Sequence, residues 1–156
     1  MCIRDSSLDA LKLIDFNFHN INLKPVLGQA IEISLNNEEI NLLSLPKHFS
    51  IDGTNFIRTN KNKIIIGSTD EYDIKPKENI FEELTDCLEN KPKWLDKNNI
   101  TNKWFGIRSR PEGEASPILK SLEKGLILCT GFYKNGILLA PACSNWISNE
   151  IKNHLF

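Results

Sequence analysis

The stretch GFYKNGILLAP, residues 131–141, is a polar turn that contains two glycines and leads into an apolar segment. Residues 125–130 before it have the composition of a short buried strand, and residues 137–156 become helical after their first positions. A strand that enters a helix through glycines leaves unbonded N–H groups at the helix start, where the helix dipole attracts anions. Gly136 also lets a flat ligand approach the main chain without a Cβ in the way. The pattern alone fits such an anion-binding end, but more often it marks an ordinary capped helix after a strand.

The rest of the chain alternates between strand and helix patterns. Its clearest local signal is a hairpin made of residues 55–59 and 63–69, which follows a turn at Asp52-Gly53. The clearest helix covers residues 77–90, which have one apolar face and acidic residues at their start. This order predicts an α+β fold with a mixed or antiparallel sheet. The other predicted elements are a helix at 7–16, strands at 24–35 and 38–46, a loop around Trp94, and a strand within 102–119 that runs into an arginine-rich loop.

Composition excludes several classes of function. The 19 basic and 20 acidic residues nearly cancel, so no positive surplus favours nucleic acid or an anionic membrane. No apolar run approaches the roughly 20 residues that a membrane helix needs, and the N-terminus lacks a charged-then-apolar signal pattern, which predicts a cytoplasmic protein. The histidines and the four cysteines lack metal-site spacing, and Cys129 and Cys143 are predicted to be small buried side chains. Residues 1–6 match nothing that follows and are interpreted as a non-native scar.

Four ordered motifs resemble the D-amino-acid-oxidase superfamily of FAD-dependent oxidoreductases, and most closely its glycine oxidases. They are similar to that superfamily's Pro-Val-x-Gly-Gln strand, its hairpin ending in Gly-x-Thr-x-Glu, its Trp-x-Gly-x-Arg strand with the loop after it, and its C-terminal flavin-contacting segment. In this chain they read PVLGQAIEI at 25–33, FIRTNKNKIIIGSTDEYD at 56–73, WFGIRSRPEGEASPIL at 104–119 and TGFYKNGILLAP at 130–141.

The resemblance implies a division into two parts. Residues 7–119 would be part of a substrate-binding domain, and residues 120–156 would be the C-terminal strand, turn and helix of a Rossmann-like FAD domain. The Gly-x-Gly-x-x-Gly turn that holds the FAD pyrophosphate in this superfamily is absent from the sequence. The expected partner is therefore a missing N-terminal FAD-binding half, and a homo-oligomer is left open.

The resemblance also assigns residues to FAD and to substrate. Arg108 matches the arginine that binds the substrate carboxylate, and Arg110, two residues on, is a competing assignment because both would share one face of a strand. Lys134 stands where glycine oxidases have a second substrate-contacting arginine, and Phe132 stands where the superfamily often has histidine. The segment expected to contact FAD consists of Gly131, Phe132, Tyr133, Lys134, Asn135, Gly136, Ile137 and Leu138.

The implied function is oxidative deamination of a small amino acid such as glycine, with hydride passing to FAD and oxygen reoxidising it. No residue of the chain is expected to act as a dedicated catalytic acid or base, and no metal is expected. A glycine oxidase activity would link the protein to thiamine biosynthesis. The alternatives are a D-amino-acid or secondary-amine dehydrogenase of the same superfamily, or a non-catalytic α+β interaction domain whose turn only caps a helix.

Overall fold

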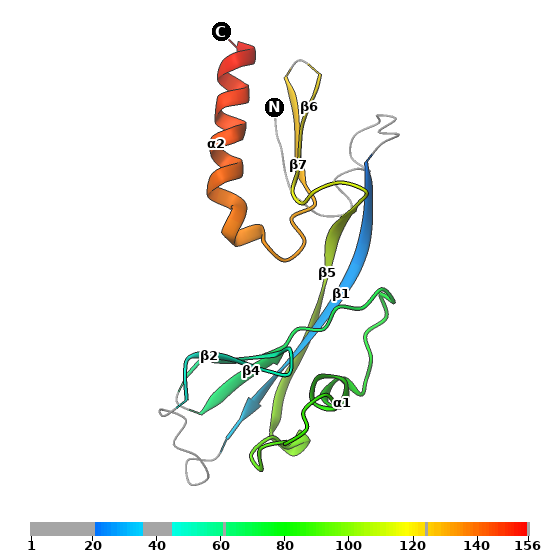
Figure 1. Ribbon diagram of the computed structural model, residues 1–156, viewed down its shortest axis with the longest axis vertical. Coiled ribbons are helices and arrows are strands. Elements are labelled where there is room, and N and C mark those ends of the chain that lie inside the picture. Colours follow the sequence, from blue (N-terminus) through cyan, green and yellow to red (C-terminus); the bar gives the residue numbers. More distant parts are fainter. Residues whose placement is uncertain (1–20, 36–44, 61, 124, 156) are drawn as a thin grey trace. The chain divides into compact units, whose positions relative to one another are not determined.

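The computed structural model describes residues 21–35, 45–60, 62–123 and 125–155 (Figure 1). The chain divides into two compact units, one containing residues 27–107 and the other containing residues 1–26 and 108–156. The elements are β1 (Asn22–Ser34), β2 (His48–Ile51), β3 (Thr54–Arg58), β4 (Lys63–Gly67), α1 (Ile80–Thr85), the 3-10 helix η3 (Lys97–Asn99), β5 (Ile100–Glu112), β6 (Ile118–Glu123), β7 (Leu126–Thr130) and α2 (Gly136–Leu155).

The described strands β1 to β5 form an antiparallel arrangement in the order β2-β3-β4-β1-β5. The predicted hairpin is confirmed as β3 and β4, with Ile57 opposite Ile65. The predicted turn at Asp52-Gly53 is also confirmed, because both residues have positive φ, 46° and 82°, as a tight two-residue hairpin requires. This turn joins β3 to β2, a strand that the sequence analysis did not predict.

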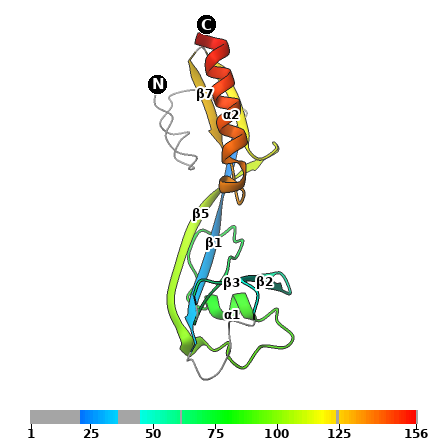
Figure 2. The ribbon, with the colours of Figure 1, turned by 90° about the vertical axis from the view of Figure 1, so that its left-hand side faces the viewer.

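Helix α1 covers one side of this sheet (Figure 2). It is much shorter than the predicted helix at 77–90, because the chain tightens after Thr85, whose carbonyl accepts a hydrogen bond from the N–H of Leu88 only three residues later. Leu88 nevertheless remains buried beside the helix, so the apolar face extends beyond the helix itself. The apolar pattern therefore predicted burial correctly and overestimated the length of regular structure.

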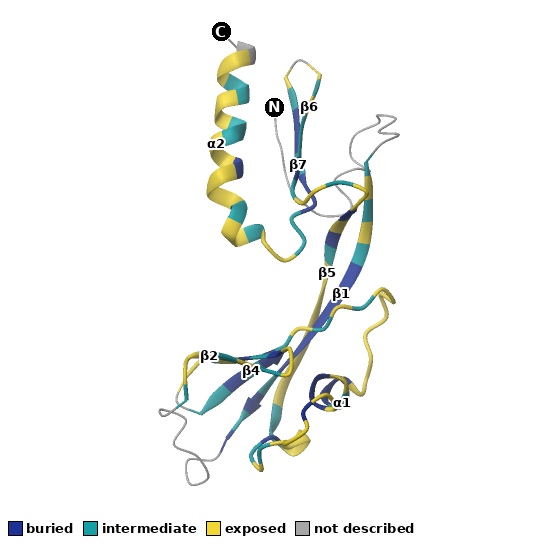
Figure 3. Ribbon diagram, viewed as in Figure 1, coloured by how far each residue is buried: buried dark blue, intermediate teal, exposed yellow. Residues whose placement is uncertain are grey.

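The core of residues 27–107 lies between the sheet and α1 (Figure 3). Phe56 is at its centre, fully buried, with its ring stacked on Phe49 at 5.0 Å and edge-on to Trp94 at 6.2 Å. Trp104 lies outside this core: 40% of it is exposed, and it belongs to the stretch of β5 from residue 101 to residue 107 in which every residue is exposed. The buried members of the core are Ile31, Ile33, Leu35, Phe56, Ile64, Ile66, Ile80, Phe81, Leu84, Leu88 and Leu95.

The second unit contains the β6–β7 hairpin followed by α2. β7 confirms the buried strand predicted at its position, whereas β6 was not predicted. The arginine-rich loop expected after β5 is shorter than predicted, because β5 continues to Glu112 and only residues 113–117 lie between β5 and β6. Among the residues that the structure describes, no helix is both long and apolar enough to cross a membrane.

Two sequence predictions lie largely or wholly outside the described residues. The helix at 7–16 is one of them. The strand at 38–46 is the other, and its last two residues, Leu45 and Pro46, are described as irregular.

Candidate functional site

The turn between β7 and α2 is held against β5 by a glycine that has no room for a side chain. Gly131 has φ of 70°, and a Cβ built there would lie 2.6 Å from Cγ of Pro111 on β5. The hydroxyl of Ser116 also donates to the carbonyl of Gly131 at 2.7 Å. Because real Cβ contacts do not come so close, glycine is required here by packing and by backbone conformation together.

Tyr133 fixes the next step of the turn. It has the positive φ of 53° that is uncommon for a residue with a side chain, and its N–H donates to the carbonyl of Ser109 on β5 at 3.2 Å. The N–H of Asn135 then donates to the carbonyl of Phe132 at 3.0 Å and closes the turn. The turn is thus a defined backbone structure anchored to the strand that carries both candidate arginines.

The aromatic ring of Tyr133 has two cations close to it. The guanidinium carbon of Arg110 lies 5.4 Å from the ring centroid, and Nζ of Lys134 lies at the same distance. Both separations are within the range in which a cation is attracted by the face of a ring. The ring of Tyr133 therefore lies close to Arg110 and Lys134, two of the three predicted substrate-binding residues.

Arg108 and Arg110 lie on the same side of β5, as the sequence analysis expected if the segment were a strand. The residues between and after them, Ser109 and Pro111, are buried on the opposite side, whereas Arg108 is half-buried and Arg110 is exposed. The alternation shows that a guanidinium at position 108 is the better shielded of the two. A shielded arginine forms stronger charge-assisted hydrogen bonds than an exposed one.

Helix α2 begins at Gly136 and presents an exposed first turn. The first helical backbone hydrogen bond runs from the N–H of Leu139 to the carbonyl of Asn135 at 2.9 Å, so the N–H groups of residues 136–138 precede the hydrogen-bonded ladder. Ile137 is 96% exposed and Leu138 is 77% exposed. Within the part of the chain that the structure describes, the helix start therefore combines N–H donors that have no helical partner with exposed apolar side chains.

Gly136 differs from Gly131 in what it would contact. A Cβ at Gly136 would lie 3.7 Å from Cβ of Phe132, which is an ordinary van der Waals separation. Packing within the described residues therefore explains the glycine at 131 and does not explain the one at 136.

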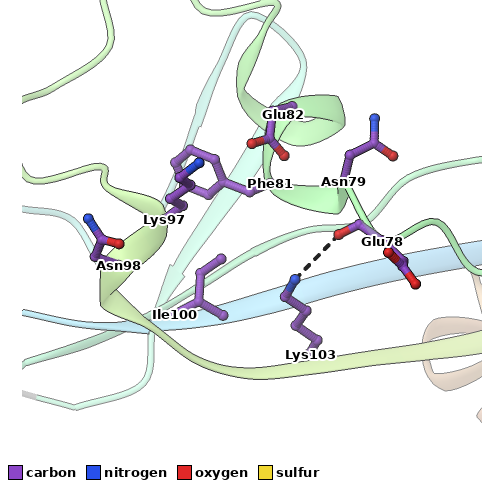
Figure 4. A pocket seen from close by; sticks show the side chains of 8 residues that line it. All are labelled: Glu78, Asn79, Phe81, Glu82, Lys97, Asn98, Ile100 and Lys103. Carbon is purple, nitrogen blue, oxygen red and sulfur yellow. Dashed lines mark hydrogen bonds between the residues drawn. The ribbon is translucent and has the colours of Figure 1, made fainter.

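A separate hollow of about 550 Å³ lies beside the start of α1, in the unit that contains the sheet (Figure 4). No sequence motif predicted this hollow. Nζ of Lys103 reaches across to the carbonyl of Glu78 at 3.4 Å, and the lining contains two carboxylates and two amines, so it has no excess of one charge. The lining residues are Glu78, Asn79, Phe81, Glu82, Lys97, Asn98, Ile100 and Lys103.

Comparisons with known proteins agree on the class of this chain. A family described as "FAD dependent oxidoreductase", abbreviated DAO, matches residues 6–150. The chain belongs to the DAO family. No curated protein matches it.

Two solved structures of DAO-like fold are similar to the chain. The glycine oxidase of Bacillus cereus ATCC 14579 superposes with a TM-score of 0.72 and 19% identity over 93% of this chain and 40% of the other. The glycine oxidase of Geobacillus kaustophilus superposes with a TM-score of 0.66 and 21% identity over 86% of this chain and 36% of the other. At these identities the likeness shows the fold, and the chain spans well under half the length of either protein.

The α+β class expected from the sequence is confirmed by this match. Sequence reasoning proposed the turn and both arginines as site residues, but it did not predict the residues that contact the turn, Ser109, Pro111 and Ser116. Their signal was present, because a serine and a proline that alternate with arginines indicate a two-faced strand. That signal gives the two faces of the strand, but it does not show that a turn distant in sequence packs against one of them.

Proposed function

We propose that this chain supplies the substrate side and the flavin edge of an FAD-dependent oxidase that acts on a small amino acid such as glycine. In this proposal residues 7–119 are part of the substrate domain, and residues 120–156 end the FAD-binding domain. The observation that carries the proposal is the anchored turn, which brings unbonded helix N–H groups and two cations together beside one strand.

The start of α2 fits the edge of a flavin. Gly136 has no packing reason to lack a side chain, and Ile137 and Leu138 expose apolar surface that an isoalloxazine ring would cover. FAD, when bound, supplies the hydride acceptor for oxidation at the α-carbon of the substrate. The N–H groups of residues 136–138 would donate to the flavin edge where negative charge develops. Losing one such donor costs about 3 kcal/mol of transition-state stabilisation at comparable sites.

The cations would orient the substrate. Arg108 is proposed as the carboxylate clamp because a guanidinium binds a carboxylate through two parallel hydrogen bonds and because it is the more shielded arginine. Arg110 remains the competing assignment, since it faces the same side of β5. Lys134 would add positive charge without the fork of an arginine.

Two residues support a substrate other than glycine within the same reaction class. Lys134 replaces an arginine of glycine oxidases, and Phe132 replaces a histidine that is frequent in the superfamily. Both replacements would change how the substrate is held, so a D-amino acid or a secondary amine is the alternative substrate. The alternative reaction is therefore D-amino-acid or secondary-amine dehydrogenation.

The test of the function uses the full-length protein. It should purify with a yellow flavin absorbance, and under anaerobic conditions an added substrate should bleach that absorbance. Glycine, D-alanine and sarcosine, added separately, would rank the substrate classes. A full-length protein that is colourless and takes up no FAD would contradict the proposal and favour a non-catalytic interaction domain.

The clamp is tested by comparing Arg108→Ala with Arg110→Ala in the same protein. Arg108→Ala should weaken substrate binding about 10- to 100-fold, the effect of losing charge-assisted hydrogen bonds, and leave FAD affinity nearly unchanged. Titration of the oxidised flavin spectrum with substrate, and of the apoprotein with FAD, measures the two affinities. The reverse pattern would transfer the role to Arg110, and equal losses of both affinities would remove the clamp assignment.

A further inference from the structure

Two cysteines lie on either side of the candidate flavin segment, one on β7 and one on α2. We infer that Cys129 and Cys143 form a reversible disulfide that ties β7 to α2. The loop closed by this bond would contain the whole turn and about the first two turns of the helix. The disulfide is inferred from contacts within this chain. Only its effect on flavin binding rests on the proposed function.

The strand register places Cys129 on the face of the hairpin that α2 covers. Leu119 is paired with Cys129, and Ser121 is paired with Ile127. Paired residues, and residues two apart on a strand, share a face, so Ser121 and Cys129 lie on the same side. The hydroxyl of Ser121 donates to the carboxylate of Glu150 on α2, which identifies that side as the one toward the helix.

The helix presents Cys143 to the same side. Cys143 precedes Glu150 by seven residues, which is close to two helical turns, so both lie on one face of α2. Only 4% of Cys143 is exposed, and it is the only buried residue among those α2 residues whose burial is described. Helix α2 and strand β7 run beside each other in both ribbon views (Figures 1 and 2).

The two thiols also affect each other electrostatically. Burial raises the pKa of the Cys129 thiol to about 11, and the adjacent Cys143 thiol contributes to the rise through its charge and a hydrogen bond. A disulfide can form only between thiols that lie next to each other, as these two do. The raised pKa also leaves little thiolate at neutral pH, so closure should be slow and the reduced pair should persist until a disulfide oxidant is supplied.

A small disulfide such as glutathione disulfide can oxidise the two thiols by thiol–disulfide exchange. The half-buried Cys129 loses its proton and attacks one glutathione sulfur, which releases one glutathione thiolate and leaves a mixed disulfide on Cys129. Cys143 then loses its proton and attacks the Cys129 sulfur, which releases the second glutathione. The two protein thiols are oxidised by two electrons, and one glutathione disulfide is reduced to two glutathione thiols.

The experiment follows this closure in the chain with Cys2→Ser and Cys87→Ser, which leaves the pair as the remaining cysteines. The chain is equilibrated with mixtures of oxidised and reduced glutathione in native buffer and in urea, alkylated, digested and analysed by mass spectrometry. We expect a single cross-linked peptide, lighter by two hydrogens, and an equilibrium constant for closure on the order of 100-fold larger in native buffer than in urea. An equal or smaller constant in native buffer would overturn the inference.

Two single variants in the same background separate the steps. Cys143→Ser should retain one glutathione on Cys129, because nothing resolves the mixed disulfide. Cys129→Ser should leave the buried Cys143 unmodified. A glutathione adduct that persists on Cys129 while Cys143 is present would show that the two sulfurs are out of reach and would also overturn the inference.

The effect on the turn has its own readout, which needs no flavin. Amide hydrogen exchange of residues 131–138 should slow at least about tenfold on closure, because the loop ends are then fixed. The thermal midpoint should rise by on the order of 5–10 °C relative to the reduced chain. Unchanged exchange would show that the bond leaves the turn unconstrained, contrary to the inference.

Discussion

The sheet unit of residues 27–107 and the helix α2 use apolar side chains in opposite ways. In the sheet unit, Phe56, Ile64 and Ile66 are fully buried between strands and α1. In α2, Ile137 and Leu138 are almost fully solvated. Exposed apolar surface loses about 25 cal/mol for every Å² left in water, so an uncovered helix start indicates a surface meant for a ligand or for more protein. The buried core stabilises the first region, whereas the helix start leaves apolar side chains in water, as the exposed stretch of β5 around Trp104 also does.

The largest effect should come from the core of the sheet unit. Phe56→Ala removes a ring that contacts Phe49 and Trp94, and it should lower the free energy of unfolding by about 3–5 kcal/mol. Chemical denaturation followed by circular dichroism measures this loss. The matched control is Ile57→Ala on the other face of β3, where the side chain is 43% exposed and the loss should be below about 1 kcal/mol. Equal losses would mean that the two faces do not differ in packing.

The next effect concerns the anchor of the turn. Gly131→Ala should cost about 3 kcal/mol, because the methyl group would clash with Pro111 and the backbone would remain at positive φ. Gly113→Ala is the control, since Gly113 has φ of 78° with open space around it, and it should cost about 1 kcal/mol for the backbone alone. The difference between the two free energies of unfolding isolates the contact with β5. If both variants lost the same amount, the turn would not be packed against that strand.

A smaller effect concerns a charge inside the sheet unit. Oε1 of Glu71 accepts hydrogen bonds from Thr69 at 2.6 Å and Gln29 at 2.8 Å, while Nζ of Lys77 lies 3.5 Å from Oε2. Burial opposes ionisation of Glu71, but the two hydrogen bonds and the charge of Lys77 outweigh it and lower the pKa below the usual 4.5.

A lowered folded pKa stabilises the protein above pH 4.5, and this stabilisation is lost as the pH falls through the folded value. Glu71→Gln should therefore cost about 1–2 kcal/mol at pH 7 and less than that at pH 3. Denaturation midpoints at the two pH values provide the measurement. Glu83→Gln, which removes an exposed partner of Lys77, is the control and should cost about 0.5 kcal/mol or less. If Glu71→Gln lowered the free energy of unfolding equally at both pH values, the ionised carboxylate of Glu71 would not be the source of the stabilisation.

The sequence predicted those features of the fold and the site that depend on neighbouring residues, and it missed those that depend on residues far apart in the chain. The hairpin of β3 and β4 and the strand β7 were found because alternation and turn residues are local signals. The length of α1 and the exposure of Trp104 depend on which other strands lie nearby, and no local pattern contains that information. The turn at residues 131–136 was found as a motif, whereas its anchor at Pro111 and Ser109 was missed because it joins residues that are distant in sequence. The roles of Arg108 and Lys134 remain predictions.

The smallest predicted effect concerns the ring of Tyr133 in the turn. Tyr133 contacts Arg110 and Lys134 through its ring, and each exposed contact of this kind is worth about 0.5–1 kcal/mol. Tyr133→Leu should therefore lower the free energy of unfolding by about 1 kcal/mol relative to Tyr133→Phe, which keeps the ring and meets the same backbone conformation. High salt should shrink this difference, because the cations are exposed to solvent ions. If the leucine and phenylalanine variants were equally stable, attraction between the ring and the two cations would not stabilise the turn. Their placement would then depend on the strand and the turn alone.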